Sequence, residues 1–503
     1  MKNEMTLTYQ TRLVLSKEQE DILDKYAFIL STVERSLYAE IAKGHPAASS
    51  KNSFLKKFNI TARQFNACRV SVEGKIEACK TGQERALTGL KQQIETLERK
   101  IKQLEKKPSK LFVLHQKKRR RNTLCHRLNS IETDLKQNRV KLCFGGKKLF
   151  RAQFSLEKNN LNSHAEWKKV WEAKRNSEFF ILGSKDESAG NQTCTAQVQS
   201  NGKLCLRLRL PKDLEEIQGK YIKIEDLTFA YGQKAIIAAL NPSKRQAISY
   251  RFKKDGKSWR VFASTALEKA EVHSLEGNGV IGIDLNVDHI AYMETDRFGN
   301  PVTKKTFPWV SYGKSKGQLR AITGDLCKEI IKYAEETKKP IVIEKLDFQK
   351  KKISLKDESK KFARLLSSFS YGMFFEFLLS RAFKHGIKIH QINPAFTSVI
   401  GRINYAKRYG LSTHLAAALC IARRYQQFSE SPCSSKGTTP DGKGSHVAFA
   451  LPERNRTKHV WHFWGKVKKK ITTVLVAHYQ AIKNRSLSPL NPTFVTGIPD
   501  SYW

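Results

Sequence analysis

Two carboxylates stand where short apolar runs end, and both could take part in metal chemistry. Asp284 closes the run IGID and Glu344 closes the run IVIE. A carboxylate at the end of a buried strand either caps the chain or binds a metal, and clustered carboxylates hold hard divalent cations. Such cations activate water and stabilise the leaving oxygen when a phosphodiester is cleaved. The simpler alternatives are a turn cap for Asp284 and a surface salt bridge for Glu344.

The segments around these acids predict an α/β domain. Residues 279–308 predict three antiparallel strands, the first of which ends in Asp284. Helix and strand then alternate: a helix over 318–338, the strand 341–346 that contains Glu344, a helix over 362–385, a strand over 387–392 and a helix over 412–425. Strands with interleaved helices indicate an α/β arrangement.

Three motifs in this region resemble, in order, those of the RuvC-like nuclease domain of TnpB proteins and of the related type V CRISPR effectors. GIDLNVDHIA with TDRFGN resembles the first, IVIEKLDF the second and STHLAAALCIARR the third, and together they span 277–424. The resemblance implies an RNase H-like nuclease fold in which Asp284 and Glu344 bind Mg²⁺ or Mn²⁺. The ordered match favours this role over the cap and the salt bridge. Asp288 and Asp347 lie nearby and are expected to be structural.

The sequence departs from the family at two places. The third motif has His414 where the family places an Asp. Neutral imidazole can bind Mn²⁺ or act as a base near neutral pH, but it brings no negative charge to attract Mg²⁺. We predict that His414 is the third catalytic and metal-site residue, and the alternative is a histidine that only caps or packs at the helix start. Second, INPAFTS resembles the family's approach to a zinc ribbon, but VIGRINYAKRYGL follows without a cysteine pair, so no zinc is expected.

The same short segment carries cationic and aromatic side chains directly before the third motif. Arg402, Tyr405, Lys407 and Arg408 are candidates for nucleic-acid binding, because such side chains contact phosphates and stack on bases. An ordinary amphipathic connector is the alternative. Near the C-terminus, HVWHFW is expected to anchor a terminal helix in the core rather than to form a metal or stacking cluster.

The N-terminal half predicts a strand followed by a helical insertion. A strand over 5–15 precedes helical periodicity over 17–142. An antiparallel coiled-coil hairpin is expected from apolar residues on both sides of Pro108: Leu87, Leu90, Ile94, Leu97, Ile101 and Leu104, then Leu124, Leu128, Ile131 and Leu135. Near its tip lies a basic run that is either a phosphate contact or a solvated turn: Lys117, Lys118, Arg119, Arg120 and Arg121.

Short alternating runs between 140 and 270 predict two β-hairpins and suggest a small basic β-barrel. The fold class is therefore multidomain α+β. By resemblance, a helical recognition lobe is inserted in a wedge β-barrel, and an α/β RNase H-like domain follows. The expected domains are 1–15 (first barrel strand), 16–140 (helical lobe), 141–276 (rest of the barrel), 277–428 (RuvC-like domain) and 429–503 (a mobile loop over 429–445 and a C-terminal helical segment).

The composition favours nucleic acid as the partner. In this chain of 503 residues, 91 Lys and Arg exceed 47 Asp and Glu by 44, and a polyanion would neutralise that excess. The sequence contains no apolar run of about 18 residues, and its start lacks a signal-peptide core. Both observations argue against a membrane as the partner. The nine cysteines, an odd number without a close CxxC pair, predict reduced thiols in a cytoplasmic protein.

The resemblance to TnpB proteins implies an RNA-guided DNA endonuclease of a mobile element, with guide RNA and target DNA as partners and metal-dependent phosphodiester cleavage. One alternative is an RNA-guided DNA-binding protein with weak or no cleavage, which His414 keeps open. Another is an accessory protein that binds the transcript of the mobile element. The oligomeric state does not follow from the sequence.

Overall fold

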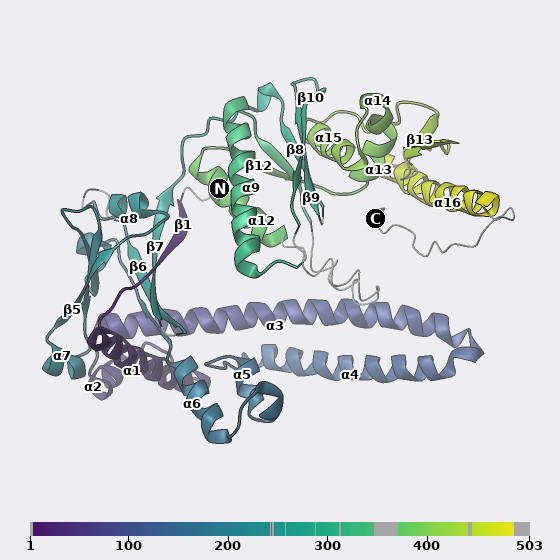
Figure 1. Ribbon diagram of the computed structural model, residues 1–503. Helices are drawn as coiled ribbons and strands as arrows, with labels where there is room; N and C mark the ends of the chain where they lie inside the picture. Colours follow the sequence, from purple (N-terminus) through teal and green to yellow (C-terminus); the bar gives the residue numbers. More distant parts are fainter. Residues whose placement is uncertain are drawn as a thin grey trace. The chain divides into compact units, whose positions relative to one another are not determined.

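The computed structural model describes residues 4–241, 243, 246–256, 258–286, 288–310, 313–346, 371–440 and 445–486 (Figure 1). The chain is a mixed α+β protein that divides into two compact units, Met1–Glu268 and Lys269–Trp503. None of the helices in the described ranges combines the length and apolarity needed to cross a membrane.

Unit 1 contains two antiparallel sheets. The first has the order β1-β7-β6-β2, from the strands Glu4–Arg12, Ser258–Glu268, Ile248–Asp255 and Glu178–Ile181. The second has the order β3-β4-β5, from the strands Cys194–Val198, Leu204–Arg209 and Tyr221–Leu227. The hairpins β3–β4 and β6–β7 are those that the sequence predicts.

The expected small β-barrel is not confirmed, because the described strands of unit 1 form two separate sheets and no closed barrel. Helix α1 (Lys17–Ala42) packs its apolar side against both sheets in one core. Its Tyr26 stacks on Phe179 of β2 at 4.4 Å between ring centroids, and Phe179 stacks on Phe252 of β6 at 4.8 Å. Alternation of apolar and polar residues along a strand shows that one face of the strand is buried. It does not show whether another strand or a helix covers that face.

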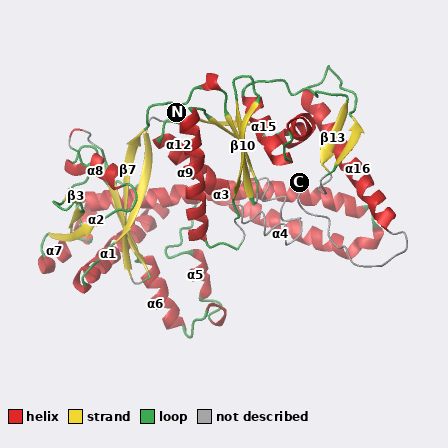
Figure 2. Ribbon diagram, turned by 45° about the horizontal axis from the view of Figure 1, so that its top comes forward, coloured by secondary structure: helices red, strands yellow, loops and turns green. Residues whose placement is uncertain are grey.

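A long helical hairpin lies between β1 and β2 in the sequence of unit 1. Helix α3 (Ala62–Glu105) has 44 residues, and α4 (Leu111–Lys136) returns alongside it after the turn η1 (Pro108–Lys110), as both views show (Figure 2). Leu90, Ile94, Leu97 and Ile101 are buried in α3, whereas α4 has no fully buried residue. The two helices form the antiparallel hairpin that the apolar spacing predicts, and its second helix is largely open to solvent.

Short helices complete unit 1. They are α2 (Lys51–Lys57), α5 (Lys147–Ala152), α6 (His164–Arg175), α7 (Lys212–Gln218) and α8 (Gln233–Ala239).

Unit 2 is built on a five-stranded mixed sheet of order β10-β9-β8-β11-β12. The strands are β8 (Ile281–Leu285), β9 (His289–Thr295), β10 (Pro301–Pro308), β11 (Ile341–Glu344) and β12 (Ile389–Ile392). The first three are antiparallel, as predicted, while β11 runs parallel to both β8 and β12. The α/β arrangement expected from the sequence is confirmed.

Helices cover both faces of this sheet. Ile281 and Ile283 of β8 join the core made with α9 (Lys316–Thr337) and α12 (Tyr371–Lys384). Gly282 lies between them in sequence and faces the opposite layer, α15 (Thr413–Tyr425), because strand side chains alternate. Residues 362–370 of the predicted helix lie outside the described ranges.

The C-terminal part of unit 2 differs from the prediction in one respect. Within the expected mobile loop, β13 (Lys436–Pro440) is a strand paired with β14 (His446–Ala450), and Thr439 is fully buried. The polar composition gave no apolar alternation from which to predict a strand. The terminal helix α16 (Val460–Ser486) is present as predicted, and Trp464 is buried in the core, which confirms the anchoring role of HVWHFW.

The remaining connector in unit 2 is helical. Segments α13 (Thr397–Gly401), η7 (Arg402–Ala406), a π-helical turn, and α14 (Lys407–Tyr409) follow one another without a break.

We expect Gly282→Ala to destabilise unit 2 by about 3 kcal/mol or more, because the added Cβ would lie 2.1 Å from the Ala418 carbonyl oxygen, which belongs to a helix backbone. Gly324→Ala in α9 is the control, since its Cβ would meet only Phe377 at 3.9 Å and better helix propensity should stabilise by up to about 1 kcal/mol. Urea unfolding of the two full-length variants measures both. Equal stability would show that α15 does not press on β8 at this point.

Candidate functional site

The parallel pairing of β8 and β11 places the two predicted acids side by side. Ile283 lies opposite Ile343 in the register, so Asp284 and Glu344 leave adjacent strands at the same level. Both acids lie on the α15 side of the sheet, because Gly282 packs on α15 and Val342 shares a small core with Ile421 of that helix. The carboxyl ends of parallel strands are a usual place for ligand sites in α/β sheets.

His414 joins this pair from the first turn of α15. Its Nδ1 lies 3.1 Å from Oδ2 of Asp284, and the imidazole is 37% exposed against 13% for the carboxylate. The helix is capped by Ser412, whose Oγ accepts from the Leu415 amide at 3.3 Å. The alternative in which His414 merely caps the helix is therefore excluded, and its ring is positioned by a carboxylate at the edge of solvent.

Two residues that sequence reasoning did not select complete the surroundings of Asp284. Asn286 Nδ2 donates to Asp284 Oδ2 at 3.1 Å and lies 3.4 Å from Nε2 of His289. The His289 ring meets the His414 ring edge to face, with 4.8 Å between centroids. Both residues stand within the first motif, DLNVDH, so the signal was present in the sequence.

Asp288 has an orienting role in this arrangement. Its Oδ1 lies 2.7 Å from Nδ1 of His289. A carboxylate at Nδ1 favours the tautomer with the proton on that nitrogen, which leaves Nε2 of His289 as an acceptor for Asn286. Asp288 itself is 73% exposed, and its contact with His289 accords with the structural role expected for it. Asp347 lies outside the described residues.

Two hydroxyl groups donate to Glu344. The buried Thr397 at the start of α13 donates its hydroxyl to Oε1 of Glu344. Tyr371 at the start of α12 donates to the Glu344 carbonyl oxygen at 2.8 Å. Burial, together with the nearby Glu344 charge, raises the pKa of Tyr371 to about 12, so the phenol remains a donor at physiological pH.

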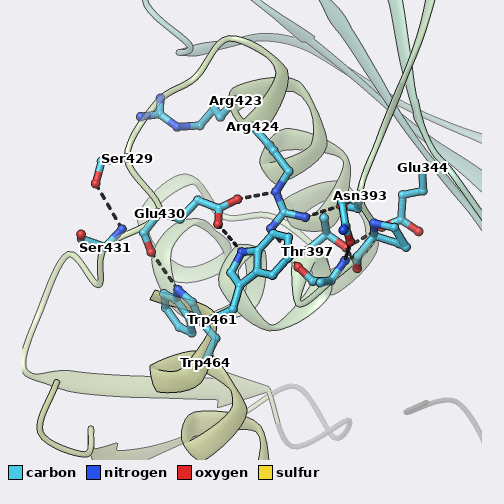
Figure 3. Close-up of polar contacts among 12 residues, drawn as sticks. Glu344, Asn393, Thr397, Arg423, Arg424, Ser429, Glu430, Ser431, Trp461 and Trp464 are labelled. Carbon is cyan, nitrogen blue, oxygen red and sulfur yellow. Dashed lines mark hydrogen bonds and ion pairs between the residues drawn. The ribbon is translucent and has the colours of Figure 1, made fainter. Parts of the chain in front are cut away.

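An arginine at the other end of α15 fixes the loop that leads to Thr397 (Figure 3). Arg424 donates to the carbonyl oxygens of Asn393 and, at 2.8 Å, Ala395, and it pairs with Glu430. Glu430 in turn accepts from the indole nitrogen of Trp461 at 2.9 Å and, through its backbone oxygen, from that of Trp464 at 2.8 Å. The network joins α16 to the loop before α13.

The donors at this site fit a divalent cation in kind and charge but do not form a complete ligand set. Two carboxylates offer the hard oxygen atoms that Mg²⁺ and Mn²⁺ prefer. Across the described ranges, however, no group of three or more His, Cys, Asp and Glu side chains is gathered closely enough to hold a metal. One oxygen of Asp284 already contacts both Asn286 and His414.

The predicted nucleic-acid contacts are only partly accessible. Lys407 and Arg408 are exposed at the end of the connector, while Arg402 is half-buried and donates to Thr439 at 3.4 Å. Tyr405 is buried at 4% exposure, and its hydroxyl accepts from Nε of Arg423 at 3.1 Å. The prediction that Tyr405 stacks on bases is therefore wrong in this structure, because the connector is a helix whose inner side packs on α15.

The basic run on α4 lies in unit 1. Its members Lys117, Lys118, Arg119, Arg120 and Arg121 belong to the first half of that helix. Lys118 pairs with Glu105 of α3 at 2.9 Å, and Arg121 donates to Asn122, whereas Arg119 and Arg120 are exposed. The run is helical rather than part of a turn.

Comparison with known proteins finds similarity in structure only. No protein-family model matches the chain, and no curated protein is significantly similar in sequence. The structure is similar to a Cas12f1–sgRNA–target DNA complex, with 12% identity, a TM-score of 0.36, and coverage of 84% of this chain and 99% of that chain.

Two further structures are similar at lower TM-scores. A CRISPR-Cas12f ternary complex has 11% identity, a TM-score of 0.21, and coverage of 83% of this chain and 98% of that chain. RuvC of T. thermophilus in complex with a Holliday junction substrate has 14% identity, a TM-score of 0.20, and coverage of 28% of this chain and 89% of that chain. These are the classes of protein that the three motifs resemble. With TM-scores this low, the likeness adds no detail to the site.

We expect Thr397→Val to lower the free energy of unfolding by about 1–3 kcal/mol, since it removes a hydroxyl donor from a partly buried carboxylate. A double-mutant cycle with Glu344→Gln, followed by urea unfolding, should give a coupling energy of about 1 kcal/mol or more. The same cycle with Thr397→Ser, which keeps the hydroxyl, should show less than half of that coupling. Additive effects in the valine cycle would contradict the contact.

Proposed function

We propose that this protein is an RNA-guided DNA endonuclease of a mobile element, and that unit 2 carries its phosphodiester-cleaving site. The observation that carries the proposal is the placement of Asp284 and Glu344 at the same level on adjacent parallel strands, with His414 against Asp284. Together with the ordered match of the three motifs, this supports a RuvC-like domain over 277–428 that begins near the start of unit 2.

The two carboxylates would attract a divalent cation, Mg²⁺ or Mn²⁺, and a bound cation would supply Lewis-acid activation of water and stabilisation of the leaving oxygen. His414 contributes separately. Because its Nδ1 faces Asp284, the proton favours that nitrogen and Nε2 keeps a lone pair. An imidazole oriented in this way can accept a proton from an attacking water. Asn286 and His289 keep the imidazole and Asp284 in place.

The proposed partners are a guide RNA and its target DNA. The excess of 44 positive charges calls for a polyanion, and RNA-guided recognition would leave the choice of sequence to base pairing. Unit 1, with its two sheets and the helical arm inserted after β1, would correspond to the wedge and recognition lobe of the proposal. The exposed members of the proposed contacts are Lys118, Arg119, Arg120, Lys407 and Arg408, of which Lys118 pairs with Glu105.

A binding protein that cleaves weakly or not at all is the second candidate. It is favoured by His414 in the third motif and by the hydrogen bond that engages Asp284, because both reduce the charge available to a cation. In that case the protein would act by occupying DNA. An accessory protein that only binds a transcript is a third and less specific possibility, since it would leave the strand-end acids without a role.

Cleavage tests the site directly. We expect the protein purified with its native locus to retain a discrete RNA and to cut matched DNA in Mg²⁺ or Mn²⁺. Asp284→Asn, Glu344→Gln and His414→Ala should each lower the cleavage rate by about 100-fold or more while DNA binding changes by less than about threefold. Glu336→Gln, an exposed acid of α9 that pairs with Lys332 at 3.8 Å, is the matched control and should leave cleavage unchanged.

Three other outcomes would change the conclusion. Matched DNA that is bound but never cut would replace the nuclease with the RNA-guided binding protein. A bound transcript without DNA binding would indicate the accessory protein. Cleavage that survives in both the Asp284 and the Glu344 variants would remove this site from the reaction.

Salt dependence tests the basic arm. We expect Arg119→Ala with Arg120→Ala to weaken RNA binding and to lower the slope of log K against log salt by about 1.4, since each phosphate contact contributes roughly 0.7 for single strands. Lys56→Ala with Lys57→Ala on α2 removes the same charge from exposed positions of the same unit and should leave the slope within about 0.5 of the original. Filter binding over a salt series measures both. Equal slopes in the two variants would show that the arm makes no specific contact.

A further inference from the structure

Unit 1 contains a cavity that the proposed nuclease site does not use. It has a volume of about 440 Å³ and lies between α1, α3, the loop 141–147 and the end of α6. Ligand pockets for small molecules usually measure a few hundred Å³, so the space suits a nucleotide. All the lining residues belong to unit 1 and lie within the described ranges.

The cavity is strongly cationic. Five cations line it, against two carboxylates: Lys75, Lys141, Lys147, Lys174 and Arg175, with Glu34 and Glu178. Lys75 is engaged by Glu34, and Lys141 pairs with Asp134 at 3.1 Å. Among the described residues, Lys147 and Lys174 form no ion pair, so their charge is available to a ligand.

Arg175 has a donor that the surrounding protein leaves unused. One of its terminal nitrogens lies 3.3 Å from Glu172, and its guanidinium stacks over the Trp171 ring at 4.7 Å. Its Nε is buried and makes no hydrogen bond within the described part of the chain. Buried donors normally have partners, so the guanidinium of Arg175 is not fully satisfied by the protein around it. Burial, and to a smaller extent the nearby Arg175 charge, lowers the pKa of Arg35 on the neighbouring helix α1.

The loop that lines the cavity is fixed at both ends. The Tyr38 hydroxyl of α1 donates to the Val140 carbonyl at 2.5 Å and accepts from the Leu142 amide at 3.1 Å. The Trp171 indole of α6 donates to the Phe144 carbonyl at 3.1 Å. Gly145 has a φ of +87°, and a Cβ there would lie 2.8 Å from the Trp171 indole nitrogen. The loop therefore has a defined shape before any ligand arrives.

An aromatic ring faces the cations. Phe144 lines the cavity, and Nζ of Lys75 lies 5.6 Å from its ring centroid. A phenyl ring beside lysines and an arginine is the combination that stacks on a base and holds its phosphate. A membrane headgroup or a sugar would not require both features.

We propose that this cavity binds a nucleotide, with its phosphate at Lys147, Lys174 and Arg175 and its base against Phe144. The nucleotide is either one unit of a bound RNA or a free mononucleotide, which share this chemistry. The site lies in unit 1 and uses none of the acids of the proposed nuclease, so it stands whether or not that proposal holds.

Cysteine footprinting tests occupancy. Cys79 and Cys143 line the cavity, whereas Cys125 lies on α4 with similar partial exposure. We expect millimolar AMP, or a single-stranded oligoribonucleotide, to slow alkylation of Cys79 and Cys143 by fivefold or more in the full-length protein. Alkylation of Cys125 in the presence of AMP should change by less than about twofold. Mass spectrometry of the alkylated peptides gives the rates.

Charge reversal links the protection to the lining cations. Lys147→Glu with Lys174→Glu should abolish the protection and weaken binding of a labelled oligoribonucleotide by tenfold or more. Lys168→Glu with Lys169→Glu places the same charges on exposed positions of α6 outside the cavity and should weaken binding by less than threefold.

The probes separate the two sources. Protection by AMP identifies a site that accepts free nucleotides, and protection by RNA alone identifies a site for one nucleotide of a chain. Both results support the cavity. Protection by neither probe would overturn the proposal, and so would equal loss of oligoribonucleotide binding in the two double variants. Either result would leave the proposed DNA cleavage site untouched, because that site is tested by cleavage.

Discussion

The close approach of α15 to β8 at Gly282 is the constraint on which the site depends. Any side chain at this position would collide with the backbone of α15, so a glycine allows the helix to lie directly on the strand. That contact fixes the level of the helix, and its first turn then brings His414 to Asp284 at the strand end. The parallel neighbour β11 adds Glu344 at the same level. This packing contact and the pairing of β8 with β11 together set the positions of three side chains from three elements.

The polar groups at the other end of α15 serve the same purpose. Arg424 satisfies two loop carbonyls and pairs with Glu430, which two tryptophan indoles also contact. Buried polar groups are costly when a partner is missing, so a fully connected set tends to hold a single arrangement. The loop fixed in this way leads to Thr397 and its hydrogen bond with Glu344. At the strand ends themselves, Asn286 donates to Asp284 and Thr397 donates to Glu344.

Most secondary structure followed from local pattern. The antiparallel strands over 279–308, the helical arm and the terminal helix were predictable, because alternation and the spacing of apolar residues report which side of an element is buried. The barrel was not, since α1 covers the apolar faces that strands might have covered. Strand β13 was missed for a related reason: its residues are polar or small, and burial of Thr439 comes from its neighbours rather than from its own hydrophobicity.

The sequence by itself determined the chemical types at the site, two acids at strand ends and a histidine in the third motif, because apolar runs and motifs are local. Only the tertiary structure decided which of them meet. It set His414 against Asp284, added Asn286 and His289, and withdrew Tyr405 into the core. Hydrogen-bond geometry and burial depend on the distance between segments far apart in the chain, and that distance is fixed by packing rather than by the order of residues.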